Sequence, residues 1–139
     1  MKKPTLMMIF VAVFALLASP AFADHHAIKI VKQENLGKYL TDAKGMTLYW
    51  FAKDQPGVSA CSGGCLEKWP AYYREQPVAP ESVPSGDFAS IKRTDGAMQT
   101  TFRGYPLYYF FKDEMVGEVK GHGVKDVWFV INPESFPNR

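Results

Sequence analysis

The chain has 139 residues, of which 47% are hydrophobic, 14% aromatic and 22% charged, with 16 basic and 14 acidic side chains and two cysteines. A chain of this length suits one globular domain. The composition excludes collagen-like, intrinsically disordered and disulfide-dense proteins, because the charge is modest, the apolar content is ordinary and cysteine is scarce.

The first 23 residues have the pattern of a secretory signal peptide. They begin with Lys2 and Lys3, continue through the apolar run 6–18, and end in Ala21-Phe22-Ala23. A basic start, an apolar run too short to cross a bilayer comfortably, and small residues in the closing triplet are typical of such a peptide. An uncleaved anchor is the alternative, but it would require a longer apolar run. We therefore expect cleavage after Ala23.

The mature protein would comprise residues 24–139, in the periplasm or secreted, with no transmembrane segment. Removing Lys2 and Lys3 leaves 14 basic and 14 acidic residues, so the mature chain is formally neutral with its histidines uncharged. A neutral chain without a basic run gives no electrostatic indication of binding to nucleic acid or to anionic lipid.

The chain contains a tandem repeat. Shifting the sequence by 59 residues aligns nine identical residues within positions 41–71, far more than chance would give. The identical pairs are Thr41/Thr100, Gly45/Gly104, Leu48/Leu107, Tyr49/Tyr108, Phe51/Phe110, Lys53/Lys112, Asp54/Asp113, Gly64/Gly123 and Trp69/Trp128. We place the two repeats at about 38–75 and 88–133, within one domain.

Short runs rich in β-branched and aromatic residues, bounded by Gly, Asp and Pro, predict strands. In chain order they are 27–32, 38–41, 46–51, 88–93, 98–102, 105–111 and 127–132. The turns that contain Gly45 and Gly104 predict hairpins between 38–41 and 46–51 and between 98–102 and 105–111. Only 65–69 looks helical, since Pro70 ends it. The Pro-rich segment 76–87 is a loop. We therefore expect an all-β fold of antiparallel sheet, either a small barrel or a sandwich.

Each repeat carries a Tyr, an aromatic residue two positions later and an Asp five positions later, as Tyr49–Asp54 and Tyr108–Asp113. With these two motifs, the Cys61–Cys65 segment, Trp69-Pro70 and Trp128, the sequence resembles the family described as a secreted repeat of unknown function, predicted lipoproteins with a Tyr-x-(Phe/Trp/Tyr)-x-x-Asp motif. The resemblance implies location and architecture, and no activity. No Cys follows the apolar run, so we expect no lipid attachment.

Cys61 and Cys65 are the only cysteines, and in an exported protein such a pair indicates a structural disulfide. A dithiol metal site or a redox-active pair is the alternative. The second repeat has Lys120 and Val124 at the equivalent positions while it keeps Trp128, so the fold tolerates the loss of the pair. Trp69 and Trp128, like Gly45 and Gly104, are interpreted as structural.

The duplicated Tyr and Asp side chains are candidate ligand-binding residues, namely Tyr49, Asp54, Tyr108 and Asp113. The alternative is architectural: an Asp at the end of a strand caps the following turn through hydrogen bonds to the backbone. Aromatic residues lie on both faces of these strands. One face must be core, whereas the other would offer a binding surface.

The three histidines suggest metal or heme. If the mature chain begins at Asp24, then His26 is its third residue, and Asp24-His25-His26 could bind copper(II) or nickel(II) in a square-planar set of nitrogens. A solvated terminus is the alternative. His122, in a glycine-flanked loop seven residues after Met115, is a candidate copper or heme ligand and a candidate member of the binding site.

The sequence carries no recognised catalytic motif. The favoured hypothesis is a non-enzymatic binding module of the periplasm or exterior, whose partner is an unknown small molecule or envelope protein. The alternatives are a copper-binding, heme-binding or redox protein of the envelope, and a structural module of an envelope assembly.

Overall fold

The structure is a computed structural model, and it describes residues 2 and 25–137. Apart from Lys2, the predicted signal peptide, its cleavage site and Asp24 lie outside the described residues. In chain order the elements are β1 (Lys29–Gln33), β2 (Gly37–Thr41), β3 (Tyr49–Phe51), α1 (Gly64–Lys68), the 3-10 turn η2 (Ser85–Asp87), β4 (Phe88–Lys92), β5 (Met98–Phe102), β6 (Tyr105–Pro106), the 3-10 turn η3 (Val124–Asp126) and β7 (Trp128–Val130). No helix in the described part of the chain is long and apolar enough to cross a membrane.

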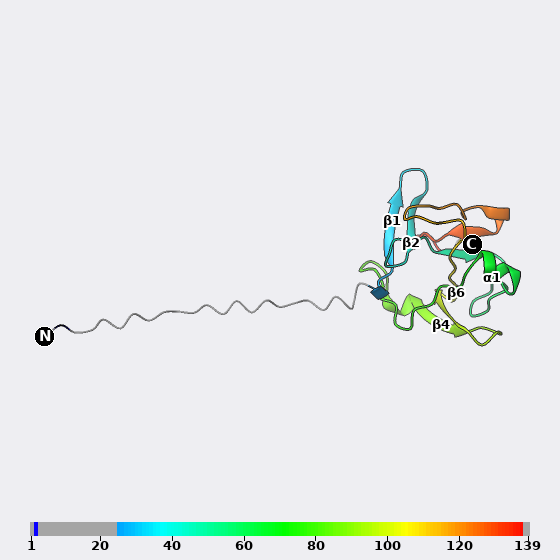
Figure 1. Cartoon of the computed structure of the whole chain (residues 1–139), viewed down its shortest axis with the longest axis horizontal. Coiled ribbons are helices and arrows are strands. Elements are labelled where there is room, and N and C mark those ends of the chain that lie inside the picture. The colour runs from blue at the N-terminus through cyan, green and yellow to red at the C-terminus, as the bar shows by residue number, and fades with distance from the viewer. Residues whose placement is uncertain (1, 3–24, 138–139) are drawn as a thin grey trace.

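The strands form three small antiparallel sheets, β1-β2, β3-β7 and β4-β5-β6. The β1-β2 hairpin and β4 lie at opposite ends of the domain, and α1 lies to one side (Figure 1). The prediction of an all-β, antiparallel fold with one short helix is confirmed. The strands of residues 25–137 do not close into a barrel.

The two predicted hairpins are shorter than expected. In the first repeat, the hairpin is reduced to a bridge between Thr41 and Thr47 and a bond from the N–H of Leu48 to the carbonyl of Leu40. The following strand, β3, turns away and pairs with β7 of the second repeat. In the second repeat β6 ends at Pro106. The N–H of Leu107 still donates to the carbonyl of Thr100, but the N–H of Thr100 donates to the carbonyl of Tyr72 and so does not complete the pair.

The turn glycines adopt the backbone conformation that the turns require. Gly45 and Gly104 have φ of 90° and 87°, in the left-handed region that favours glycine. A Cβ at Gly104 would also lie 3.1 Å from Cβ of Pro56. Their structural interpretation therefore has a physical basis in both repeats.

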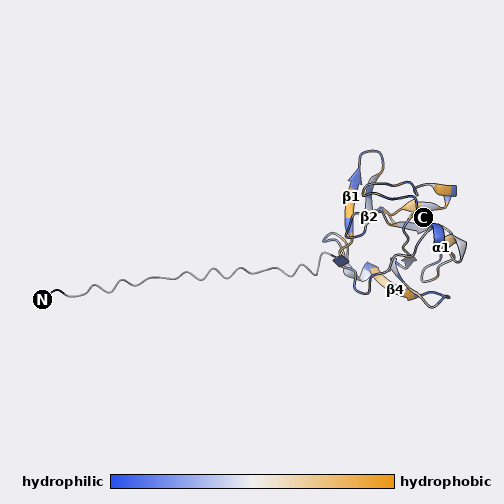
Figure 2. Ribbon diagram, in the orientation of Figure 1, coloured by the Kyte–Doolittle hydropathy of each residue, from blue (hydrophilic) through white to orange (hydrophobic). Residues whose placement is uncertain are grey.

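The hydrophobic core has two parts, separated by the segments that carry the motifs. Leu48 and Leu107 belong to the first cluster, whereas Tyr49 and Tyr108 belong to the second. Successive residues of an extended chain point to opposite sides, so each motif segment has a buried cluster on both of its faces. Hydrophobic and hydrophilic residues share β1 and β4, as expected for strands with one face on the core (Figure 2).

Burial on both faces corrects the expectation of an outward aromatic face. Tyr49 and Tyr108 are fully buried, and Phe110 is 7% exposed. Trp50 and Tyr109 are partly buried against the first cluster. Among the aromatic residues of the described segments, Phe111 is the exposed one, with 48% of its surface accessible to solvent.

Candidate functional site

The two motif tyrosines pair with each other across the centre of the domain. The N–H of Tyr49 donates to the carbonyl of Tyr108 at 2.9 Å, and the N–H of Tyr108 donates back at 3.0 Å. Outside this pair, Tyr49 is opposite Val130 and Tyr108 is opposite Ala71, which are themselves 59 residues apart. The repeats are therefore related by an approximate two-fold axis that passes between the two tyrosines.

The side chains of the motifs exchange partners across this axis. The hydroxyl of Tyr49 donates to the Asp113 carboxylate, and the hydroxyl of Tyr108 donates to Oδ2 of Asp54 at 2.7 Å. The Tyr of each motif thus bonds to the Asp of the other motif. We call these four residues the Tyr-Asp clasp.

The second oxygen of each Asp binds its own loop. Oδ1 of Asp54 accepts the N–H of Ala60 at 2.6 Å, and Oδ1 of Asp113 accepts the N–H of Lys120 at 3.0 Å. Each carboxylate therefore caps a turn within its repeat and also joins the two repeats. Burial raises the pKa of both Asp54 and Asp113 above the ordinary value of 3.8, because the charged form loses hydration.

A ligand-binding role for the four clasp residues stays a prediction. Asp54 is 3% exposed and Asp113 is 8% exposed, and both tyrosines are fully buried. Burial also raises the pKa of the two phenols, so they stay protonated and act as donors. Their polar groups bond to one another and to the backbone, so a ligand would have to displace protein partners to reach them.

Beside the clasp, four aromatic rings form a continuous stack. Trp69 and Trp128 are parallel, with ring centroids 3.8 Å apart and an interplanar angle of 3°. Phe110 stacks on Trp69 at 4.2 Å, and Phe51 stacks on Trp128 at 4.1 Å. The stack therefore alternates between the repeats and obeys the same two-fold relation as the clasp. Trp69 and Trp128 form its centre, and their structural interpretation stays a prediction.

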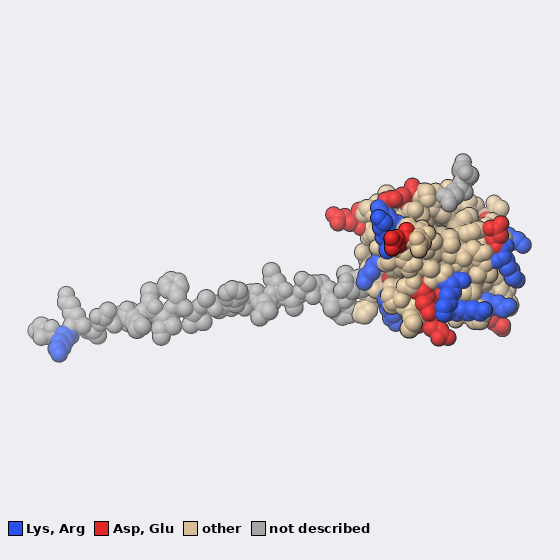
Figure 3. All heavy atoms as spheres, turned by 90° about the horizontal axis from the view of Figure 1, so that it is seen from above, with Lys and Arg blue, Asp and Glu red and all other residues tan. Residues whose placement is uncertain are grey.

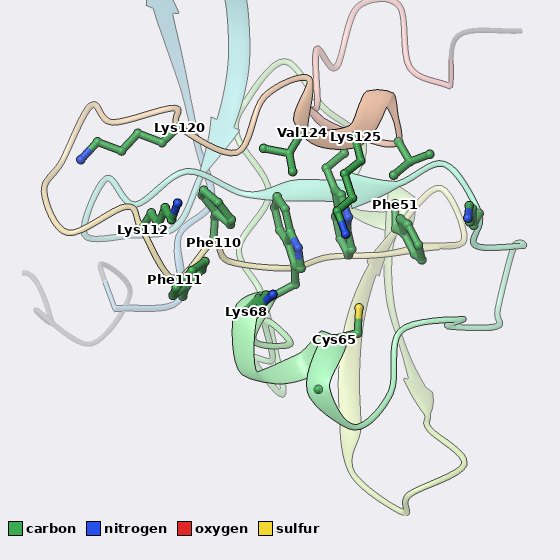
Figure 4. A pocket seen from close by; sticks show the side chains of 14 residues that line it. Phe51, Cys65, Lys68, Phe110, Phe111, Lys112, Lys120, Val124 and Lys125 are labelled. Atoms are coloured by element: carbon green, nitrogen blue, oxygen red, sulfur yellow. The ribbon is translucent and has the colours of Figure 1, made fainter.

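A groove of about 550 Å³ lies over this stack. Figure 4 shows Phe51 and Phe110 well apart along it, with Cys65 and Lys68 of α1 on one side and Val124 and Lys125 on the other. The lining residues, which together define the aromatic groove, are Phe51, Lys53, Gly64, Cys65, Lys68, Trp69, Phe110, Phe111, Lys112, Lys120, Val124, Lys125, Val127 and Trp128.

Five of the lining residues are lysines, and none is acidic. In the described structure only Lys120 of the five forms an ion pair, with Glu118 at 3.0 Å. Lys112 lies over the ring of Phe111, 5.7 Å from its centroid. Basic side chains gather on the right of Figure 3, the side on which Figure 1 places α1. The aromatic groove is therefore a basic site.

The two cysteines form a disulfide, as expected, and this bond supports one wall of the groove. It connects the start of α1 to the preceding loop, and α1 carries Lys68 and leads directly into Trp69. Arg93, which is 7% exposed, donates to the carbonyl of Cys61 and, at 2.8 Å, to Oγ of Ser59. The disulfide loop is thereby attached to the turn between β4 and β5.

The histidines lie away from the clasp. His25 and His26 are exposed at the start of the described chain. His122 lines a second cavity of about 410 Å³ with Trp50 and Phe129. Its Nδ1 accepts the N–H of Val130 at 3.1 Å, so this bond occupies the lone pair of Nδ1. A role of His122 as a copper or heme ligand stays a prediction. Within residues 25–137 no three His, Cys, Asp or Glu side chains gather in a way that could hold a metal ion.

The groove was not predicted from the sequence, although some of its lining residues are identical in the two repeats. Phe51/Phe110, Lys53/Lys112 and Trp69/Trp128 are among the pairs that both repeats keep. The other three lysines come from α1 and from the loop before β7, and they have no identical partner in the other repeat. Their proximity depends on the fold.

The chain belongs to the family described as a secreted repeat of unknown function. The family model matches residues 30–72 and again 89–132, once for each repeat. The expected repeats and the resemblance to this family are therefore confirmed, and the description as secreted agrees with a location in the envelope or outside the cell. No curated protein and no solved structure gives a significant match.

Proposed function

We propose that the protein is a binding module of the periplasm or cell exterior, without catalytic activity, and that its ligand occupies the aromatic groove. The observation that carries this proposal is the groove itself. Its volume of about 550 Å³ falls in the range of small-molecule sites, and its floor is built from a rigid stack of rings. A preformed apolar surface binds a ligand without first having to become ordered.

The lining also supports binding rather than catalysis. Apart from lysines, the groove is lined by Phe, Trp, Val, Gly and the disulfide, so it presents no carboxylate, imidazole or hydroxyl side chain. The side chains with acid-base chemistry, Tyr49, Asp54, Tyr108 and Asp113, are bonded to one another in the clasp. The predicted signal peptide and the family description support the location.

The proposal can be tested with a mixed library of neutral and charged ring compounds, followed by amide chemical shifts in NMR. We expect the ligands found to shift the resonances of Lys68, Trp69 and Trp128. Shifts confined to the second cavity or to the β1-β2 hairpin would contradict the proposal.

A matched pair of glycine substitutions makes this test sharper. Gly64 lines the groove and Gly86 lies far from it in sequence, and a Cβ at either position would meet nothing within 4 Å. Neither backbone requires glycine. Gly64→Leu places a side chain at the groove and should weaken binding about tenfold, whereas Gly86→Leu should leave it unchanged. Equal affinities for the two variants would exclude the groove as the site.

A further inference from the structure

We infer that the ligand of the aromatic groove is an organic dianion, an apolar body with an acidic group at each end. This inference rests on the proposed function, since it names the chemical class that the groove would bind. It is carried by three features of the lining: its charge, its hydrogen-bonding character and its two-fold symmetry.

The first feature is an excess of positive charge. Lys53, Lys68 and Lys125 line the groove without an ion pair to any described residue. The lining itself contains no acidic side chain, so the charged side chains that face the groove are all positive. A cleft with charges of one sign and apolar walls concentrates ions of the opposite sign. The ligand should therefore be an anion.

The second feature is that the side chains of the groove can donate hydrogen bonds but cannot accept them. Besides the lysines, the indole N–H groups of Trp69 and Trp128 are donors. Neither has an acceptor among the described residues, where every fully enclosed polar side-chain atom has a partner. Neither N–H group is therefore fully enclosed, and both rings line the groove. Carboxylates accept hydrogen bonds and donate none, and they suit such a lining.

The third feature is that the cations occur at both ends of the ring stack. Lys53 follows Phe51 by two residues, as Lys112 follows Phe110. Phe51 and Phe110 are the outer rings of the stack, and the two-fold relation exchanges them. Each end thus has a lysine, and between the ends lie rings and valines, with Lys68 and Lys125 on the two sides of the groove. This arrangement matches an apolar molecule with two separated acidic groups better than one with a single acidic group.

Three soluble naphthalene compounds of similar shape test the inference: naphthalene-2,6-dicarboxylate, 2-naphthoate and the neutral naphthalene-2,6-dimethanol. Affinity is measured by calorimetry at low and high salt, and the site by NMR. We expect the dicarboxylate to bind about tenfold more tightly than the naphthoate, and the naphthoate more tightly than the diol. Salt should weaken the dicarboxylate most.

Charge-matched variants identify which lysines act. Lys53→Gln combined with Lys112→Gln should reduce the preference for the dicarboxylate over the diol by about tenfold or more. Lys32→Gln combined with Lys44→Gln removes the same charge from exposed positions outside the groove, and it should leave this preference unchanged. Equal effects of the two double variants would overturn the inference, because the attraction would then be a property of net charge alone.

The inference and the proposed function fail in different ways. If all three compounds bind in the groove with equal affinity, the groove is a binding site and the dianion inference is wrong. If none of them, and no compound of the mixed library, shifts a groove resonance, the proposed function itself is wrong. Polygalacturonate, an acidic polymer without an apolar body, is the competing class, and its binding in preference to the dicarboxylate would also overturn the inference.

Discussion

The hydroxyl group of Tyr49 donates a hydrogen bond to the carboxylate of Asp113, and these two residues belong to different repeats. The same bond, from Tyr108 to Asp54, joins the repeats in the opposite sense. The motif that each repeat carries is therefore completed only by the other repeat. This relation explains why Tyr and Asp occur together in both halves of the chain.

Removing one hydroxyl of the clasp should destabilise the whole domain. Tyr49→Phe or Tyr108→Phe leaves a buried carboxylate without one of its donors, at a cost of about 2 kcal/mol in each case. Chemical denaturation measures this change. Tyr73→Phe is the control, because no hydrogen bond of the Tyr73 hydroxyl is found in the described structure, and it should change stability little. A loss for Tyr73→Phe equal to that for Tyr49→Phe would contradict the prediction.

A double-mutant cycle distinguishes bonding between the repeats from bonding within one. Tyr49→Phe should couple with Asp113→Asn by about 1 kcal/mol and should be nearly additive with Asp54→Asn. Asp54 is only five residues from Tyr49 in sequence, whereas Asp113 is 64 residues away. Stronger coupling to Asp54 would show that the motif acts within its own repeat.

Gly121 should not tolerate a side chain. A Cβ at this position would lie 2.8 Å from ring atoms of Tyr49 and 2.9 Å from the ring of Trp69, and both rings are held in the core. Gly121→Ala should therefore cost about 1–3 kcal/mol and disturb the near-ultraviolet signal of the ring stack. Gly86→Ala, where the added Cβ meets nothing within 4 Å, serves as control. Wild-type stability of Gly121→Ala would refute the close approach.

Loss of the disulfide should affect the groove more than the fold. The ring between Cys61 and Cys65 is small, so chain entropy gives it only about 2 kcal/mol of stabilisation. Cys61→Ser combined with Cys65→Ser should leave a folded protein in which α1 and Lys68 are less well ordered. Thermal unfolding and hydrogen exchange of α1 measure the two effects. Unchanged exchange in α1 would show that the disulfide does not position the groove wall.

The pKa of His122 should lie below its ordinary value of 6.5, because the ring is partly removed from water. Its Nδ1 also accepts the N–H of Val130, which protonation of Nδ1 would break. As the pH falls through 6.5, the unfolded chain takes up this proton before the folded chain does, so this residue destabilises the fold in acid. NMR titration of the ring, with the Val130 amide as a second probe, should show both changes together. A measured pKa above 6.5 would contradict the assignment.

Much of the fold was accessible from sequence because its signals are local. Each of the seven predicted strand ranges contains or overlaps a strand, such as β5 at Met98–Phe102. The range 46–51 contains β3 and, before it, a single bridge at Thr47. α1 begins one residue before the predicted start and ends at Lys68, before Pro70. Turn residues, the alternation of apolar and polar residues, and proline affect only the few positions around them, so a single sequence is enough to predict their effects.

The pairing of strands was less accessible, because it depends on contacts distant in sequence. The sequence predicted that the strand from Met46 would pair with its neighbour in a hairpin, whereas β3 pairs with β7. Burial of both faces of the motif segments likewise depends on side chains that the other repeat contributes to the two core clusters. Net charge was also uninformative about the groove, since a chain can be neutral overall and still concentrate five lysines around one cavity.

The two-fold relation of the repeats has a consequence for how such a chain assembles. In a symmetric homodimer, a contact from residue i to residue j is matched by the reciprocal contact, and Tyr49 with Asp113 and Tyr108 with Asp54 follow that rule. The covalent connection through the Pro-rich loop makes this association intramolecular, so it no longer depends on protein concentration. The domain is thus organised as a dimer of half-domains fused into one polypeptide.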